Sequence, residues 1–169
     1  MKRVLFLDID GVLNSNFWNG SHQREISDGT LIDEEKVKIL APLIKRTNER
    51  TNAKIILHSE WRIWFDAELN PLRTEAKRLI DIFAKEGLSI EGVTPDLTTE
   101  EIRGSKKFSL VKAEEILLWL KTNDDVAGWV VLDDLDLHNE QIGKHQVMPD
   151  QAIGLTIEDV GKAERILLS

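Results

Sequence analysis

The chain has 169 residues, of which 41% are hydrophobic, so it is long enough and apolar enough to form one compact domain. It contains no cysteine, which excludes a disulfide framework, a thiolate nucleophile and a thiolate metal ligand. The net charge of −8, from 22 basic and 30 acidic residues, argues against broad electrostatic binding of nucleic acid. No apolar run is long enough for a signal peptide or a membrane span, so we expect a cytoplasmic protein without membrane contact.

Three short apolar runs predict strands that are buried on both faces of a sheet. The runs are Val4 to Leu7, Ile55 to Leu57, and Trp129 to Leu132. Each run stops abruptly at polar residues, which are Asp8, His58-Ser59 and Asp133-Asp134. Continuous apolar runs of this length are typical of the strands of a parallel sheet.

Helical patterns lie between and after these runs. Apolar residues recur at i, i+3, i+4 and i+7 in the segments 37–44, 76–83 and 113–120. Acidic residues precede the first of these segments, and Gly87 is placed to end the second. Thr156 and Asp159 form a capping-box pattern ahead of a last helix through Leu167. Strands that alternate with helices predict an α/β domain with a central parallel sheet.

Two segments fit neither pattern. Residues from about 14 to 30 are rich in Asn, Ser, Gly and His, and predict a small flap or loop insertion. Thr94 to Lys107 contains Pro95, Gly104 and many charges, and predicts a second loop. Loops of this length are often functional. We otherwise expect a single domain over residues 1–169.

The acidic residues at the strand ends predict a metal site. Ligands of open α/β sheets bind outside the carboxyl ends of the strands, so we expect Asp8, Asp10, Asp133 and Asp134 to lie near one another. A lone acidic pair after a strand is usually a solvated cap, but here two pairs each end a buried run. Such carboxylates repel unless a cation lies between them. Oxygen ligands without cysteine favour a hard cation, and Mg²⁺ fits best.

The same segments resemble the four motifs of the haloacid dehalogenase (HAD) superfamily of phosphatases. Residues 4–13, VLFLDIDGVL, resemble the first motif, in which DxDG(T/V)L follows a hydrophobic strand. Ile55 to Ser59 resembles the second motif, a strand that ends in Ser or Thr. Lys112 resembles the basic third motif, and Val130 to Asp134 resembles the acidic fourth. The resemblance implies a Rossmann-like HAD fold with helices on both faces of the sheet.

A narrower resemblance extends nearly to the C-terminus. It is to the HAD domains of Swiss Army Knife RNA repair proteins and their stand-alone bacterial and phage relatives. The segments that carry it are DxDGVLN from Asp8 to Asn14, SxWR from Ser59 to Arg62, EEIxxWL from Glu114 to Leu120, Leu132-Asp133-Asp134, and Gly154-Leu155-Thr156.

The resemblance implies a Mg²⁺-dependent phosphatase that works in two steps. Asp8 would attack phosphorus and form an aspartyl-phosphate. Asp10 would act as general acid and then as general base, and its main-chain carbonyl would bind Mg²⁺. Asp133 and Asp134 would complete the metal site, and the sequence leaves open which of them binds the metal directly. The metal would offset the repulsion between the nucleophile and an anionic substrate.

The resemblance also assigns phosphate-binding roles to Ser59, Asn14, Lys112 and Arg62. Ser59 would donate a hydrogen bond to a phosphoryl oxygen, and Lys112 would neutralise both Asp8 and the phosphate. Arg62 would hold a second phosphate or a backbone oxygen with its guanidinium fork.

Several of these residues also have a plain structural interpretation. Ser59 suits a helix cap, and Lys112 suits a solvated helix position, which leaves Lys106 and Lys107 as alternatives for the third motif. The tryptophans near the motifs suit core packing, and these are Trp61, Trp64 and Trp119. His58 suits a structural histidine.

The gaps between motifs bear on the substrate. Neither Asn14 to Lys54 nor Arg62 to Lys112 holds enough pattern for the large cap domain that many HAD enzymes carry. Because an uncapped site in this superfamily goes with large substrates, a terminal phosphate of a nucleotide or nucleic-acid end is the leading hypothesis. A small-molecule phosphatase is the second, with the flap or a partner subunit covering the site. The third is a phospho-acceptor or non-catalytic phosphate-binding module, although receiver domains place their acidic motifs in the reverse order.

Overall fold

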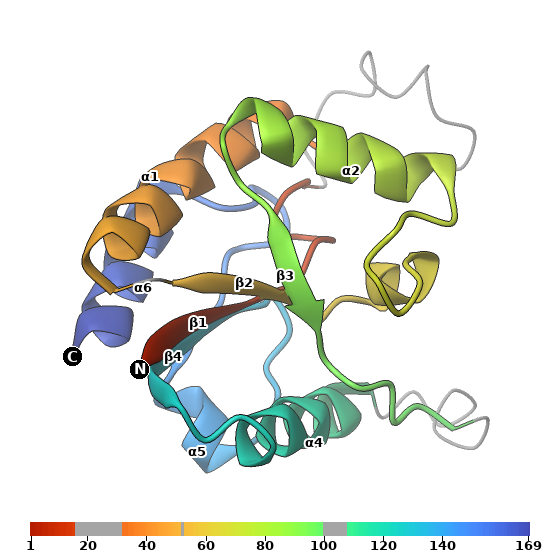
Figure 1. Ribbon diagram of the computed structural model, residues 1–169. Coiled ribbons are helices and arrows are strands. Elements are labelled where there is room, and N and C mark those ends of the chain that lie inside the picture. The colour runs from red at the N-terminus through yellow and green to blue at the C-terminus, as the bar shows by residue number, and fades with distance from the viewer. Residues whose placement is uncertain (16–31, 52, 100–107) are drawn as a thin grey trace.

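The computed structural model describes residues 1–15, 32–51, 53–99 and 108–169. A five-stranded sheet of parallel strands, in the order β3-β2-β1-β4-β5, lies at its centre (Figure 1). The strands are β1 (Lys2–Leu7), β2 (Lys54–Leu57), β3 (Ile90–Val93), β4 (Val126–Leu132) and β5 (Gln146–Val147). The helices are α1 (Glu34–Thr51), the 3₁₀ helix η2 (Glu60–Trp64), α2 (Thr74–Lys85), α4 (Phe108–Lys121), α5 (Glu140–Gly143) and α6 (Ile157–Leu168). The predicted Rossmann-like α/β architecture is therefore confirmed.

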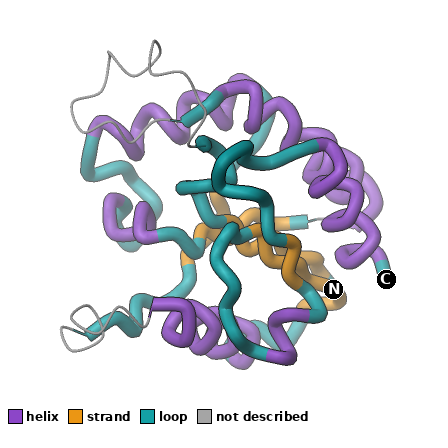
Figure 2. Tube along the Cα trace, turned by 180° about the vertical axis from the view of Figure 1, so that it is seen from behind, coloured by secondary structure: helices purple, strands orange, loops and turns teal. Residues whose placement is uncertain are grey.

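The sheet separates two hydrophobic layers, because successive side chains of a strand point to opposite faces. On the central strand β1, Leu5 and Leu7 pack with residues of α1, α2 and α6. Val4 and Phe6 face the other way and pack with residues of α4 and α5. The two groups of helices lie on opposite sides of the sheet, and the view from behind shows the same layers (Figures 1 and 2). Because both faces of β1 are covered from Val4 to Leu7, these residues are all apolar rather than alternating with polar ones.

The three predicted strands are neighbours in the middle of the sheet. Leu7 of β1 pairs with Leu57 of β2 on one side and with Leu132 of β4 on the other. The last residues of all three strands therefore lie at one level. This register brings together the polar residues that follow them, and it places those residues at the carboxyl edge of the sheet.

The predicted helices are also present. The helical patterns at 37–44, 76–83 and 113–120 lie within α1, α2 and α4. Gly87 follows α2 with a φ of 71°, the left-handed conformation that glycine adopts at little cost. At the start of α6 the capping box is complete, since Thr156 Oγ1 accepts from the backbone N–H of Asp159, and the Asp159 carboxylate accepts from the backbone N–H of Thr156.

The sequence did not reveal four short elements, namely β3, β5, η2 and α5. The predicted flap lies almost wholly outside the described residues, as do residues 100–107 of the second predicted loop. The described ranges contain no inserted cap domain over the carboxyl edge of the sheet. No helix in these ranges has both the length and the apolar composition needed to cross a membrane.

Candidate active site at the carboxyl edge of the sheet

The sheet itself fixes the backbone of the site. The backbone N–H of Asp8 donates to the Leu132 carbonyl at 2.9 Å, and that of His58 donates to the Leu7 carbonyl at 3.0 Å. Asp133 follows β4 and its side chain is fully buried. The first residues after β1, β2 and β4 are therefore held by the last rungs of the ladder. A loop residue held in this way has little freedom to move away from its neighbours.

Six of the predicted site residues surround one pocket of about 360 Å³ at this edge. They are Asp8, Asp10, Asn14, Ser59, Lys112 and Asp134. Asp133 lies beneath them at 0% exposure. The pocket is formed by residues from the ends of β1, β2 and β4 and by the helix α4, so segments far apart in the sequence contribute to it.

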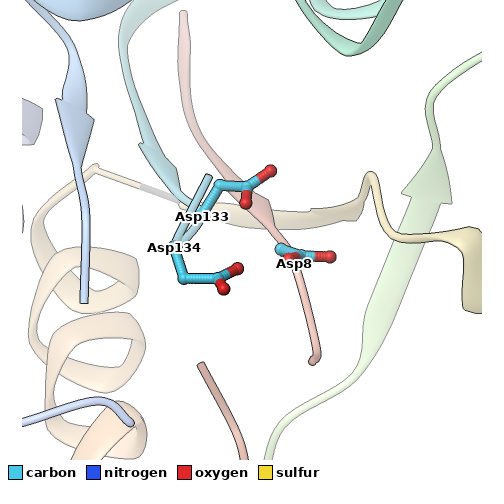
Figure 3. Close-up of side chains that lie close together, drawn as sticks. All are labelled: Asp8, Asp133 and Asp134. Carbon is cyan, nitrogen blue, oxygen red and sulfur yellow. The ribbon is translucent and has the colours of Figure 1, made fainter. Parts of the chain in front are cut away.

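Three carboxylates form the centre of the site. Asp8, Asp133 and Asp134 each offer one oxygen, and these oxygens lie within 4.8 Å of one another. Figure 3 shows the side chains of Asp133 and Asp134, from the end of β4, beside that of Asp8, from the end of β1. Gly11 allows this close approach, because a Cβ at residue 11 would lie 2.4 Å from Asp134 Oδ2. Its φ of 80° also favours glycine.

Lys112 is the basic residue of this cluster. Its Nζ lies 3.5 Å from Asp8 Oδ1 and 2.9 Å from Asp133 Oδ2. Burial alone would lower the pKa of Lys112, but Asp8 and Asp133 raise it above its usual range, so the ammonium group stays charged. Lys106 and Lys107, the alternatives for the third motif, lie outside the described residues.

Asp133 is held by contacts to both of its oxygens. Oδ1 accepts from the backbone N–H of Leu135 at 2.9 Å, while Oδ2 lies close to Lys112 and 3.0 Å from His58 Nε2. Burial alone would raise the pKa of Asp133, but His58, Lys112 and the Leu135 N–H together hold it well below its usual range. Burial lowers the pKa of His58, which disfavours a charged ring, and its Nε2 lies 3.0 Å from Asp133 Oδ2.

Asp8 is electrostatically different from Asp133. Burial raises its pKa well above the usual range, Lys112 opposes this, and the carboxylates of Asp133 and Asp134 raise it further. Burial and the nearby Asp133 also raise the pKa of Asp134. A divalent cation between these carboxylates would relieve the repulsion and favour their charged forms, so the cluster fits a metal ion.

Asp10 is the exposed acid of the site, and two side chains hold its carboxylate. Asn14 Nδ2 donates to Oδ1 at 3.1 Å, and Trp61 Nε1 donates to Oδ2 at 3.3 Å. Asn14 Oδ1 in turn accepts from the backbone N–H of Gly11 at 2.8 Å, which closes the turn after β1. Asn14 therefore lines the pocket and also contacts the acid beside it.

The turn after β2 combines a site residue with a structural one. Ser59 lines the pocket, and its side chain also accepts from the backbone N–H of Trp61, so it caps η2. Both interpretations of Ser59 from the sequence thus fit its position. Trp61 is 2% exposed, in line with the core role expected from the sequence, yet its indole N–H reaches Asp10.

Arg62 is not among the residues that line the pocket, and the phosphate-binding role that the resemblance implies for it stays a prediction. It is 4% exposed, and its guanidinium forms an ion pair with the buried carboxylate of Glu115 in α4. The same group contacts Asp96 at 3.3 Å, Thr94 Oγ1 at 3.3 Å and the His58 carbonyl at 3.2 Å. These contacts occupy both terminal nitrogens, which turns the fork towards the protein interior.

The sequence did not reveal which residues support the side chains of this site. Glu115 lies opposite the apolar positions 113, 116, 117 and 120 of its predicted helix, so the helical pattern did not indicate that it is buried. His58 and Trp61 gave no signal either, because a histidine or tryptophan after a buried strand suits ordinary packing.

The comparisons with known proteins agree with this geometry. The family model described as "HAD domain in Swiss Army Knife RNA repair proteins" matches residues 4–160. No curated protein and no solved structure matches the chain significantly. The match covers nearly the whole chain and includes every element from β1 into α6. The chain therefore belongs to the family of HAD domains found in Swiss Army Knife RNA repair proteins.

Proposed function

We propose that this HAD-type hydrolase is a Mg²⁺-dependent phosphomonoesterase that acts through an aspartyl-phosphate on Asp8. The observation that carries the proposal is the position of Asp8, whose carboxylate lies beside Lys112 and within 4.8 Å of two further carboxylates at the pocket. A nucleophile needs a free lone pair; Lys112 lowers the pKa of Asp8 against the larger raising effect of burial, and a bound cation would favour the ionised form further.

The carboxylate cluster is the proposed Mg²⁺ site. When bound, Mg²⁺ would neutralise charge on the phosphoryl group and on the attacking carboxylate. Asp8 and Asp134 both line the pocket, and we assign them as the direct carboxylate ligands, with the Asp10 carbonyl. Asp133 is the weaker candidate for direct ligation, because its two oxygens already contact Leu135, Lys112 and His58. Its role in this proposal is to hold Lys112 in place.

The remaining side chains supply phosphate binding and proton transfer. Lys112 would pair with a phosphoryl oxygen as negative charge builds on it, and Ser59 would donate a hydrogen bond to another. Asp10 would give its proton to the leaving oxygen as the P–O bond breaks. The carboxylate thus formed would then take a proton from the water that attacks the aspartyl-phosphate. Arg62 has no part in this scheme, because its guanidinium is turned inward.

Two classes of substrate fit different observations. The family is that of RNA repair proteins, and the described residues leave the pocket without a cap domain, which supports a terminal phosphate of a nucleotide or polynucleotide. Glu60, Leu135 and Gln151 also line the pocket. The Glu60 carboxylate would repel a second phosphate near the scissile one, which favours a small phosphomonoester as the second candidate.

The test is phosphate release by the wild type and by Asp8→Asn, with Mg²⁺ or with EDTA. The substrates are p-nitrophenyl phosphate, mononucleotides, and oligonucleotides with a 3′- or 5′-phosphate. We expect release that requires both Mg²⁺ and Asp8, and that is fastest on oligonucleotide ends. The same requirements with a preference for small phosphates would keep the mechanism and change the substrate class. Release by Asp8→Asn at the wild-type rate would disprove the assignment of the nucleophile.

A further inference from the structure

Asp10 is the site acid that is most open to solvent. It is exposed and lies in the turn after β1, whereas Asp8 and Asp133 are buried behind the last rungs of the sheet. An exposed aspartate normally samples several rotamers. A proton donor that changes rotamer in this way would be aligned with the leaving oxygen only part of the time. Something in the chain must therefore orient this side chain if it is to transfer a proton efficiently.

Trp61 has the properties that such a group requires. Its side chain is 2% exposed, and its ring packs against Trp64 with centroids 4.9 Å apart. It belongs to η2, which is capped by Ser59 and begins directly behind β2. The indole is thus fixed from several sides, and its Nε1 lies 3.3 Å from Asp10 Oδ2. Because the indole is held rigidly, its hydrogen bond limits the rotamers that the Asp10 side chain can adopt.

The chemistry of the indole adds a second constraint. An indole N–H can donate a hydrogen bond but cannot accept one. A proton carried by Asp10 therefore cannot lie on the lone pair of Oδ2 that faces Trp61. The Asn14 amide occupies a lone pair of Oδ1 in the same way, through Nδ2 at 3.1 Å. The lone pairs that remain free to carry the proton are those not covered by these two donors.

We propose that Trp61 is a positioning residue for Asp10, whose Nε1–H fixes the Asp10 carboxyl group for proton transfer to the leaving oxygen. The inference rests on the proposed phosphomonoesterase activity, and it gives Trp61 a role beyond packing. In the first step the proton of the Asp10 carboxylic acid passes to the leaving oxygen while the P–O bond breaks and the Asp8–phosphorus bond forms. The resulting carboxylate still accepts from Trp61 Nε1–H, so the side chain is oriented for the second step as well.

The dependence on the leaving group distinguishes this role from a structural one. An alkyl phosphate needs a proton on its leaving oxygen, whereas p-nitrophenyl phosphate releases a stable anion without one. The value of kcat/KM reports the steps up to the first departure of the alcohol or phenol. In Trp61→Phe we expect kcat/KM to fall roughly tenfold or more for an alkyl phosphate, a part of the full contribution of general acid catalysis. For p-nitrophenyl phosphate we expect a change of less than about threefold.

Two variants calibrate this comparison. Asp10→Asn removes the proton donor itself, so it should show the same selective loss in larger measure. Trp119→Phe is the matched control, because Trp119 packs on Phe6 on the other face of the sheet and belongs to a different cluster. Trp119→Phe replaces a tryptophan by phenylalanine in the same way, and the ratio of kcat/KM between the two substrates should not change. An equal loss on both substrates in folded Trp61→Phe would overturn the proposal.

A second measurement reads the hydrogen bond without turnover. The five tryptophans give five indole N–H signals in a proton–nitrogen correlation spectrum of the full chain. The signal that disappears in Trp61→Phe belongs to Trp61, or an assignment by sequence connectivities identifies it if that variant fails to fold. Asp10→Asn should shift this signal more than the other four. An unchanged Trp61 signal would overturn the inference, whereas a wild type that hydrolyses neither substrate would refute the proposed function itself.

Discussion

Removal of Arg62 should reveal whether it supports the fold or binds the substrate. In Arg62→Met the buried Glu115 loses its ion pair, and the carbonyl of His58 loses a donor. In Glu115→Leu the guanidinium loses its buried ionic partner and keeps the more exposed carboxylates of Asp96 and Glu60, while the backbone N–H of Leu97 loses its acceptor. The double variant removes both charges together and places apolar groups of similar size in the same space.

The burial of the pair sets the size of the effect. The side chain of Arg62 is 2% exposed and that of Glu115 is 1% exposed, so water cannot replace a lost partner at either group. Removal of one partner from such a pair costs about 3–5 kcal/mol. For a chain of this size that loss lowers Tm by roughly 6–20 °C. The double variant should recover about 2 kcal/mol or more relative to the sum of the single variants, because it leaves no unpaired charge.

The assay is urea unfolding at pH 7, followed by tryptophan fluorescence and by circular dichroism. The control is Asp81→Ala, which removes the exposed ion pair of α2 in which Lys77 Nζ lies 4.0 Å from Asp81. This variant should unfold at the same urea concentration as the wild type, because exposed pairs contribute little. KM for p-nitrophenyl phosphate is then measured for Arg62→Met at a temperature where the variant is folded, and we expect no change beyond about twofold.

The outcome that would refute this reasoning is specific. If Arg62→Met unfolds at the wild-type urea concentration and its KM rises tenfold or more, Arg62 binds the phosphate and the ion pair contributes little. Additive losses in the double variant would also count against the pair, because they would mean that Arg62 and Glu115 act independently.

Three further predictions follow from the site and from the last helix. Asp8→Asn should raise the Tm of the metal-free protein at pH 7. The pKa of Asp8 is raised in the folded state, so ionisation of this carboxyl group destabilises the fold as pH rises above its unfolded pKa of about 3.9. Thermal melts in EDTA should therefore show that the gain in Tm becomes smaller towards pH 4. Lys112→Met should lower kcat by roughly 10²- to 10³-fold with Mg²⁺ present, whereas Lys121→Met at the end of the same helix should leave it unchanged. Thr156→Ala should cost about 1 kcal/mol in urea unfolding, because it removes the cap of α6.

The sequence was informative where burial and local pattern coincide. The central strands β1, β2 and β4 are covered on both faces, so their apolar runs identified them. The edge strands gave no such run, because β3 is only partly buried and has Gly92 within it, and β5 has two residues. Short edge strands owe their conformation to the neighbouring strand rather than to their own residues, so a pattern along the chain cannot reveal them.

The site could be anticipated in its chemistry but not in its supporting contacts. Strand ends of a parallel sheet meet at one edge, which is why Asp8, Asp133 and Ser59 were expected together and are found around one pocket region. The direction of a side chain in a turn depends on the turn type, which the sequence did not disclose for residues 60–64. Arg62 was therefore given a substrate role, although its partners lie in α4 and in the loop after β3.

The 3₁₀ conformation of η2 explains how one short turn supports several parts of the site. Successive residues of a 3₁₀ helix point about 120° apart, since it has three residues per turn. Neighbouring side chains therefore reach different elements, with Trp61 directed to the loop after β1 and Arg62 to α4, the helix that carries Lys112. Just before η2, His58 contacts Asp133 at the end of β4. The turn thus links the elements that bring the proton donor, the basic residue and the buried acid together. Substitutions in it should disturb these three groups even where the substituted side chain does not line the pocket.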